Sequence, residues 1–359
     1  MLSRFYKFFP VPDYLNLSTV GIDISDESIK FAELKKTKGW KVARCGTVDL
    51  PAGCIIAGKI MNREALVSAL RQIQQENKID LIHASLPEEE TFVVRMKVPE
   101  VKRADLRESI ELLLEEHIPL SIDQVVFDYE IYREPTPADP NFILGVFVAP
   151  IKLVEDYTGV IEESGLRLAS LEIEVQSGAR ALIKSDDLGT YLIVDIGKTR
   201  TGFSIISNQI VLFTSSIKSI GGANMTQAIE RSLNVGQPEA ENLKIQKGLL
   251  NSPSNKEVFQ ALIPVVSAFK DEMSRHCIYW QTMAENHEVE EGIRKIIFSG
   301  GQSTLPGLTE YISANIEFPV EIGKVWNLDT TEGRLSSVDY QNSLRYVTAI
   351  GLALRGINL

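Results

Sequence analysis

Cysteine and histidine are scarce in this sequence of 359 residues. Its three cysteines form no Cys-x-x-Cys pair, which is the usage expected in a reducing compartment. Its four histidines are scattered without the spacing of metal ligands. The cysteines are Cys45, Cys54 and Cys277, and the histidines are His83, His117, His276 and His287. We therefore do not expect a metal centre built from histidine and cysteine.

Long apolar runs and an excess of basic residues are also absent. No apolar run approaches the roughly 20 residues that a membrane-spanning helix needs. The net charge of −11 argues against nucleic acid as the main partner. Residues 1–10 carry four aromatic side chains together with Arg4 and Lys7, and are too short and too polar for a signal peptide. Two alternatives remain for this tail, a weak contact with a membrane or partner and packing over the folded chain.

The sequence does contain a strand–Asp–turn–strand pattern at residues 191–206. Two apolar runs flank a polar turn that begins with Asp195 and contains Gly197, as in a β-hairpin. Glycine lets the backbone approach a ligand closely, and the N–H groups of such a turn can hold a metal–phosphate group. A similar pattern at 19–34 contains Asp23, 172 positions before Asp195. Two copies suggest two similar lobes that face each other.

One tempting alternative for this turn is a P-loop, because Gly197-Lys198-Thr199 looks like the end of that motif. A P-loop requires a glycine five residues before Gly197, where this chain has Leu192. It also requires a helix after the turn, whereas the pattern here predicts a strand. The P-loop interpretation is therefore rejected.

Strands and helices alternate through the rest of the chain. The pattern predicts strands at 20–24, 29–34, 40–48 and 79–86, a loop at 51–58 and an amphipathic helix at 63–75. A compact β-α-β-β-α segment follows Pro87, with strands at 91–98, 125–132 and 142–149 and helices at 102–117 and 152–164. Further on, the pattern predicts helices at 176–183, 225–232, 258–285 and 346–354, and a strand at 293–298. The segment after Pro87 looks inserted into the first lobe.

Taken together, these features resemble the actin-like ATPase superfamily and, within it, the PilM family of type IV pilus assembly, relatives of the division protein FtsA. The matching residues are Val20-Gly-Ile-Asp-Ile24, Asp195-Ile-Gly-Lys-Thr-Arg-Thr201, Pro238-Glu-Ala-Glu-Asn-Leu-Lys244 and Phe298-Ser-Gly-Gly301. The resemblance implies an α/β, two-lobed actin-like (ribonuclease H-like) fold with an inserted subdomain, called 1C in this family. It divides the chain into a tail (1–18), a first lobe (19–86, 168–190 and 341–359), the insert (87–167) and a second lobe (191–340, helical at about 221–270).

The resemblance also implies a site for ATP or ADP with Mg²⁺. Asp23 and Asp195 would face Mg²⁺ through water. The residues implied to contact nucleotide are Asp23, Ser28, Lys30, Asp195, Gly197, Thr199, Thr201, Gly221, Gly222, Glu241, Lys244, Gly300 and Gly301. Glu172, Glu174 and Gln176 are alternatives for the residue that activates water. Because the sequence singles out none of them, we expect ATP binding with at most weak ATPase activity. Ser25 stands where the family has glycine, which narrows the first phosphate turn.

The function implied by the resemblance is that of an ATP-binding assembly protein at the cytoplasmic face of the inner membrane. It would bind the N-terminal cytoplasmic peptide of a PilN-like membrane protein and link it to the pilus motor ATPases, with self-association as a further option. Contact with the membrane would be peripheral or indirect. The alternatives are an FtsA-like, filament-forming membrane tether and a small-molecule kinase. The basic stretch 97–107 could bind a partner or be a solvated helix face.

Overall fold

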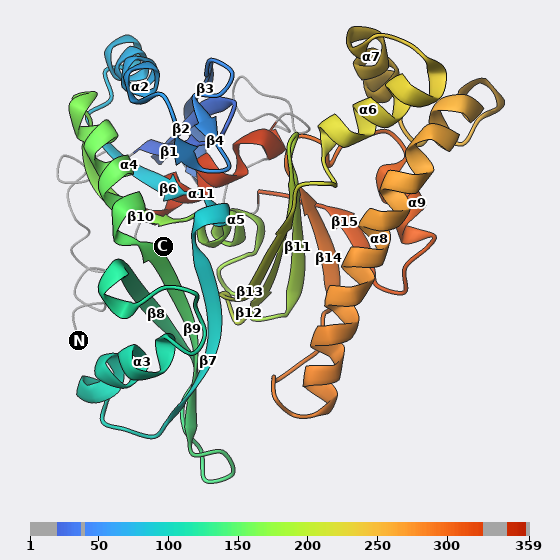
Figure 1. Ribbon diagram of the computed structural model, residues 1–359. Helices are drawn as coiled ribbons and strands as arrows, with labels where there is room; N and C mark the ends of the chain where they lie inside the picture. The colour runs from blue at the N-terminus through green and yellow to red at the C-terminus, as the bar shows by residue number, and fades with distance from the viewer. Residues whose placement is uncertain (1–19, 37–39, 326–342, 357–359) are drawn as a thin grey trace.

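The computed structural model describes residues 20–36, 40–325 and 343–356 (Figure 1). The expected N-terminal tail, residues 1–18, lies outside the described residues. Over the described residues, the fold contains no helix with both the length and the apolar character needed to cross a membrane.

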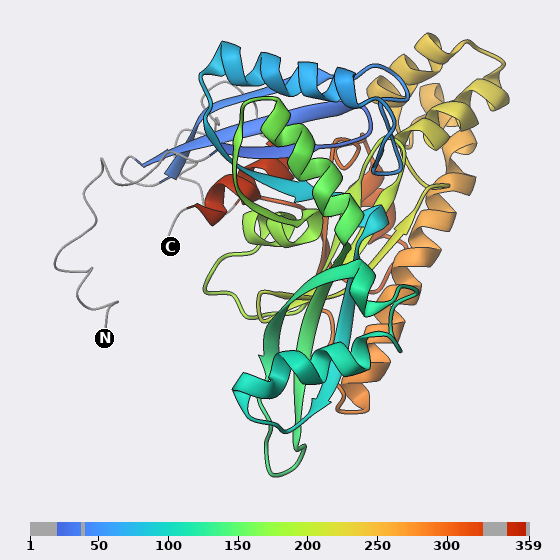
Figure 2. The ribbon, with the colours of Figure 1, turned by 60° about the vertical axis from the view of Figure 1, so that its left-hand side comes forward.

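The first lobe is built on a five-stranded mixed sheet in the order β10-β6-β1-β2-β3. Its strands are β1 (Val20–Ile24), β2 (Ser28–Lys36), β3 (Trp40–Asp49), β6 (Leu81–Leu86) and β10 (Arg167–Ile173). Two helices cover one face, α2 (Arg63–Asn77) and α4 (Ile151–Glu163), and two cover the other, α5 (Glu174–Leu182) and α11 (Val347–Arg355) (Figures 1 and 2). Because the sheet is covered on both faces, all five residues of β1 are buried.

Helix α11 packs closely against both the sheet and helix α5, and one glycine at each contact allows this. A Cβ atom on Gly21 would lie 1.9 Å from the carbonyl oxygen of Ala349, and one on Gly351 would lie 1.9 Å from that of Ser177. No side chain fits at such distances, so bare backbone is required on both contacts. The small-residue helix predicted near the end of the chain is thereby packed between β1 and α5.

The second lobe repeats this sheet. Read from the opposite edge, its order β15-β14-β11-β12-β13 matches β10-β6-β1-β2-β3 strand for strand. The strands are β11 (Tyr191–Ile196), β12 (Thr201–Ser207), β13 (Ile210–Ile217), β14 (Lys295–Ser299) and β15 (Val320–Ile322). Like β1, β11 pairs antiparallel with the strand that follows it and parallel with a later one, β14. The prediction of two similar lobes from the two hairpins is confirmed.

The described part of the second lobe contains four α-helices: α6 (Gly222–Leu233), α7 (Gln237–Lys247), α8 (Lys256–Glu285) and α9 (Leu308–Ser313). Helix α8 runs along the outer face of the sheet and buries one apolar stripe against it, from Val258 to Met283 (Figure 1). Helices α6 and α7 form the end of the lobe above the sheet (Figure 1). The chain reaches α6 directly after β13, which places the start of this helix beside the turn of the β11–β12 hairpin.

Between β6 and α4 the chain forms a separate three-stranded antiparallel sheet, in the order β7-β9-β8 (Figure 2). We call residues 87–150 the insert, a shorter segment than the expected 87–167, because α4 packs with α2 on the sheet of the first lobe. Its strands are β7 (Phe92–Pro99), β8 (Val125–Arg133) and β9 (Asn141–Pro150), and its helix is α3 (Leu106–Leu114). These elements enclose an apolar core of their own.

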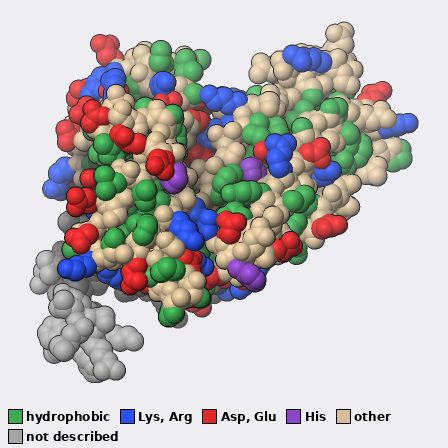
Figure 3. Space-filling view, turned by 60° about the horizontal axis from the view of Figure 1, so that its bottom comes forward, with side chains coloured by type: hydrophobic (Ala, Val, Ile, Leu, Met, Phe, Trp, Pro, Cys, Tyr) green, Lys and Arg blue, Asp and Glu red, His purple; other side chains and the backbone are tan. Residues whose placement is uncertain are grey.

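One face of the molecule, with the insert and second lobe in view, shows acidic and basic side chains interspersed (Figure 3).

Two local predictions needed correction. The helix expected at 102–117 is shorter, because a 3-10 turn at Arg103–Asp105 precedes α3 and the helix ends at Leu114. The loop expected at 51–58 contains half of a small hairpin, in which β4 (Ile55–Ile56) pairs with β5 (Lys59–Ile60). Ala57 and Gly58 form its two-residue turn with φ of 51° and 80°. The carboxylate of Asp26 accepts both of their N–H groups, at 2.9 and 3.1 Å, which holds this turn in place.

Candidate functional site

A cavity of ≈ 660 Å³ lies where the two hairpin turns meet. Because the two sheets share one topology, Asp23 near the end of β1 and Asp195 near the end of β11 hold equivalent positions, and both line this cavity. Of the residues expected to contact nucleotide, those on the wall are Asp23, Ser28, Lys30, Asp195, Gly197, Thr199, Glu241, Gly300 and Gly301. The cavity thus gathers residues that are as far apart as 278 positions in the sequence, from Asp23 to Gly301.

The first turn is closed by the residue that departs from the family pattern. The hydroxyl of Ser25 donates to the carbonyl oxygen of Ser28 at 2.8 Å, and its backbone N–H donates to the same oxygen at 3.0 Å. The ammonium of Lys30 lies 3.2 Å from the carboxylate of Asp23 and 3.4 Å from the Ser25 hydroxyl. Burial alone would lower the pKa of Lys30, but Asp23, with smaller contributions from Glu174 and Asp195, outweighs it and raises that pKa. Lys30 is therefore a fixed positive charge on the cavity wall.

The second turn contains Asp195, a carboxylate whose negative charge is only partly balanced by nearby positive charges. Burial within the cleft raises the pKa of Asp195, and the nearby charge of Asp23 raises it further, against the opposing effects of Arg200 and Lys30. Among the described residues no donor forms a hydrogen bond with this carboxylate. Gly300 is essential to its setting, because φ is 85° there and a Cβ atom would lie 2.4 Å from Oδ1 of Asp195. Asp195 and Asp23 together form a place where added positive charge is favourable.

This arrangement suits Mg²⁺ held through water more than a metal held by protein alone. In the part of the chain that the structure describes, no group of three or more His, Cys, Asp or Glu side chains is placed to hold a metal ion. Mg²⁺ usually retains several waters and takes one or two carboxylates plus substrate phosphates. Asp23 and Asp195 provide that number of carboxylates, so the residues present fit a Mg²⁺–phosphate group.

Four residues expected to contact nucleotide do not line the cavity: Thr201, Gly221, Gly222 and Lys244. The N–H of Gly222 donates to the carbonyl oxygen of Gly197 at 3.0 Å, and the N–H of Ala223 donates to that of Lys198 at 2.8 Å. The start of α6, including Gly221, is therefore used to support the second turn. The hydroxyl of Thr201 is likewise occupied, since it donates to the carbonyl oxygen of Ile220 at 2.5 Å.

Lys244, the fourth of these residues, is 1% exposed and joins α6 to α7. Its ammonium donates to the carbonyl oxygen of Gly222 at 3.1 Å, the hydroxyl of Thr226 at 3.0 Å and the carboxylate of Glu241 at 2.8 Å. Glu241 is only partly buried and does reach the cavity. Lys244 therefore positions Glu241 without itself lining the cavity.

The structure also separates the three alternatives for the water-activating residue. Glu172 is buried away from the cavity between Arg180, at 2.6 Å, and Arg355. Gln176 accepts the N–H of Ile173 at 3.2 Å and so helps to begin α5. Only Glu174 lines the cavity. Strand β10 ends at Ile173 and a helix begins at Glu174, so strand alternation no longer governs where these side chains point.

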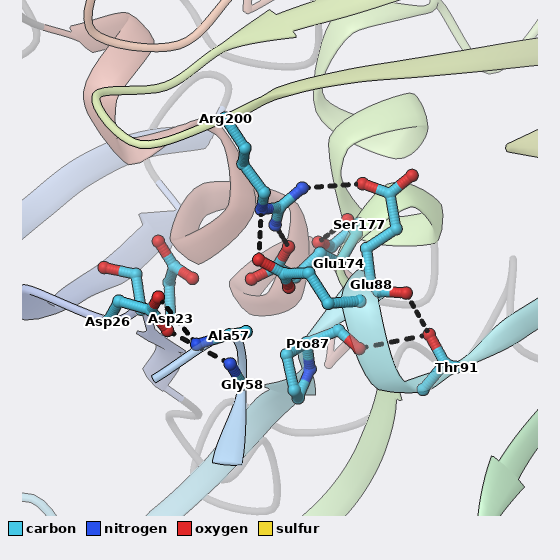
Figure 4. Close-up of polar contacts among 12 residues, drawn as sticks. Asp23, Asp26, Ala57, Gly58, Pro87, Glu88, Thr91, Glu174, Ser177 and Arg200 are labelled. Carbon is cyan, nitrogen blue, oxygen red and sulfur yellow. Dashed lines mark hydrogen bonds and ion pairs between the residues drawn. The ribbon is translucent and has the colours of Figure 1, made fainter. Parts of the chain in front are cut away.

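Sequence reasoning missed an arginine with three acidic partners (Figure 4). Arg200, in the second turn, pairs with Glu88 at 2.9 Å, Glu89 at 2.6 Å and Glu174 at 2.5 Å. Burial raises the pKa of Glu88 to about 7 and that of Glu174 to about 8, although Arg200 acts against both shifts. The run Glu88-Glu89-Glu90 at the start of the insert was the available signal, but nothing local connects it with Arg200.

Comparison with solved structures supports this description of the fold. The structure of the PilM-PilN type IV pilus biogenesis complex has a TM-score of 0.77 at 19% identity and covers 96% of this chain and 100% of that chain. MreB5 of Spiroplasma citri, solved bound to ADP, has a TM-score of 0.56 at 14% identity and covers 95% and 97%. At these identities the likeness concerns the fold. Together with the duplicated sheets, it defines the chain as a two-lobed actin-like protein.

The family follows from the sequence match. A family model described as "Type IV pilus assembly protein PilM" matches residues 21–357, so the chain belongs to this family. The cell division protein FtsA of Neisseria meningitidis serogroup B is 23% identical in an alignment that covers 87% of this chain and 83% of FtsA. The family expected from the sequence is thereby confirmed.

Proposed function

We propose that the cavity binds ATP or ADP together with Mg²⁺. The observation that carries this proposal is the meeting of Asp23 and Asp195, from two equivalent hairpins, across one cavity. Seven carboxylates but only four cationic side chains line the described part of that cavity. A nucleotide without a counter-ion would meet a net negative wall, so the charge balance favours binding with a metal. When bound, Mg²⁺ supplies positive charge to the phosphate oxygens.

The rest of the wall suits the parts of a nucleotide. Lys30 offers an ammonium to phosphate, and the turn from Gly197 to Thr199 offers backbone and hydroxyl groups. Gly300 and Gly301 leave bare backbone against which a nucleoside can lie. Glu241 would accept hydrogen bonds from ribose hydroxyls, and the exposed apolar side chain of Ile245 lies on the same wall.

The same geometry supports binding with at most weak hydrolysis. A general base must be ionised before it can accept a proton from water. Glu174 is the one candidate that reaches the cavity, and burial raises its pKa to about 8. Arg200 already pairs with this carboxylate at 2.5 Å, so the ion pair competes with any water for the same oxygen. We infer that nucleotide acts here chiefly as a structural or switching ligand.

We further propose that the protein binds the N-terminal cytoplasmic peptide of a PilN-like membrane protein. It thereby links the inner-membrane complex of the type IV pilus to its motor ATPases, from a peripheral position at the cytoplasmic face. Membership of the PilM family supports this proposal, as does the likeness to a protein solved as a PilM-PilN complex. The match to FtsA keeps an FtsA-like, filament-forming tether as the second candidate.

The nucleotide proposal is tested by titrating fluorescent ATP and ADP, with and without Mg²⁺, into the wild type and Asp195→Ala. We expect Mg²⁺-dependent binding that weakens at least about tenfold in the variant, because one of two metal-facing carboxylates is lost. Asp271→Ala is the matched control, since Asp271 is exposed on α8 outside the cavity. Equal affinity of Asp195→Ala and wild type, or no binding by either, would contradict the proposal.

The partner proposal is tested by pull-down with immobilised N-terminal peptides of PilN-like proteins and with scrambled peptides of the same composition. We expect retention by the native peptide alone. Filaments that form with ATP while no peptide is retained would favour the FtsA-like alternative.

A further inference from the structure

Arg200 joins three parts of the molecule that lie far apart in the sequence. It lies in the turn between β11 and β12 of the second lobe, and its side chain lines the cavity. Glu88 and Glu89 belong to a 3-10 turn, Glu88–Glu90, that joins β6 of the first lobe to β7 of the insert. Glu174 begins α5 of the first lobe. One guanidinium thus holds both lobes and the first residues of the insert together (Figure 4).

The cluster contains more negative than positive charge, and this imbalance makes its ion pairs easy to rearrange. Three carboxylates share one guanidinium, and Oε1 of Glu88 is buried with no hydrogen-bond partner among the described residues. Each of the three glutamate side chains is at most 14% exposed. Burial of ionised groups costs free energy that their pairing only partly offsets, so such a cluster is weak evidence of stability and better suited to a switch.

The 3-10 turn can pass a change at Arg200 into the insert. Its backbone is tied closely, since the N–H of Thr91 donates to the carbonyl oxygen of Glu88 at 3.3 Å and the Thr91 hydroxyl donates to that of Pro87 at 3.1 Å. Strand β7 starts at the next residue, Phe92, and pairs with β9 along its whole length. A shift of Glu88 and Glu89 therefore moves the start of β7 and, with it, the first pairs that β7 forms with β9.

We propose that Arg200 is a latch that couples occupancy of the cleft to the insert. An anion in the cavity, the phosphate of the proposed nucleotide, competes with Glu88, Glu89 and Glu174 for the guanidinium. Once Arg200 turns to the phosphate, the turn at Glu88–Glu90 loses its two ion pairs with the second lobe. The proposal rests on the proposed nucleotide site and adds the residue through which that site acts on the insert.

The test compares hydrogen–deuterium exchange of peptides covering residues 87–99 in wild type and Arg200→Met, without nucleotide and with Mg²⁺·ADP. In the wild type, nucleotide should speed exchange at residues 88–93 several-fold. Arg200→Met should show the fast rate already without nucleotide and no further change with it. Arg167→Met is the matched control, because Arg167 forms an exposed ion pair with Asp80 far from the cluster, and it should behave as wild type.

The outcomes separate the latch from the nucleotide site. If wild type binds Mg²⁺·ADP but exchange at 88–93 is unchanged, the latch is refuted while the proposed function stands. If Arg200→Met without nucleotide exchanges no faster than wild type, the latch is refuted whatever the nucleotide result. A protein that binds no nucleotide overturns both proposals. Arg200→Lys is the second variant should Arg200→Met not fold, and its single ammonium should give an intermediate rate, because it cannot pair with three carboxylates at once.

Discussion

Replacing Glu88 with glutamine should make the protein more stable at pH 8 and leave its stability at pH 5 nearly unchanged. Glu88 is 8% exposed, and only one of its two carboxylate oxygens has a partner, Arg200 at 2.9 Å. Burial raises its pKa from 4.5 to about 7; Arg200 acts against this shift, and Asp195 and Glu89 add to it. The folded protein therefore holds this proton more tightly than the unfolded chain does.

The sign and size of the effect follow from linkage. Because the folded pKa lies above the unfolded one, the contribution of Glu88 to stability is complete below pH 4.5 and is lost as the pH rises through about 7. The interval between the two pKa values corresponds to roughly 3 kcal/mol. Glutamine has the shape of the protonated carboxyl and does not ionise. At pH 8 the variant should avoid about 1–3 kcal/mol of this cost.

The assay is urea unfolding of wild type and Glu88→Gln between pH 5 and pH 8, with the midpoint followed by circular dichroism. The midpoint of the variant should rise relative to wild type as the pH increases. Glu76→Gln, at an exposed position of α2, serves as the control and should run parallel to wild type. Parallel profiles of Glu88→Gln and wild type, or a variant less stable at pH 8, would refute the reasoning.

Three further predictions concern the cavity and its support. Gly300→Ala should weaken nucleotide binding at least tenfold and destabilise the protein by about 2 kcal/mol or more, because the added Cβ atom would lie 2.4 Å from Oδ1 of Asp195. Gly165→Ala is the control, since Gly165 also has a positive φ but nothing within 4 Å of the added Cβ atom. In the same titration and melting assays it should show the effect of backbone strain alone. Lys244→Met should lower the melting temperature by several degrees while nucleotide affinity falls less than about threefold, since this side chain supports α6 from outside the cavity. Ser25→Gly should tighten nucleotide binding several-fold in the same titration, because it removes the hydroxyl that closes the first turn onto Ser28 at 2.8 Å; unchanged affinity would show that this closure does not oppose phosphate.

The local sequence pattern was sufficient to predict the part of the fold that is repeated, namely the two hairpins and the sheets built on them. An apolar strand, an acid and a polar turn are neighbours in the chain, so their physics is local and both copies could be recognised without a structure. Two equal hairpins then imply two equal sheets, and the sheet orders agree strand for strand. Asp23 and Asp195 reach the cavity for this reason, since each lies near the end of the central strand of its sheet, and Gly300 directly follows β14, the strand beside β11.

Tertiary structure decided the contacts between segments that no local pattern relates. The glycine pair before α6 looked like a phosphate site, but the N–H of Gly222 is used by the carbonyl of Gly197, 25 residues earlier. Which of Glu172 and Glu174 faces the cavity depended on the residue at which β10 gives way to α5. Arg200 and Glu88 are 112 residues apart and meet only because the lobes pack against each other. The sequence determined where phosphate-binding turns could form, and the packing of the lobes determined which charges surround them.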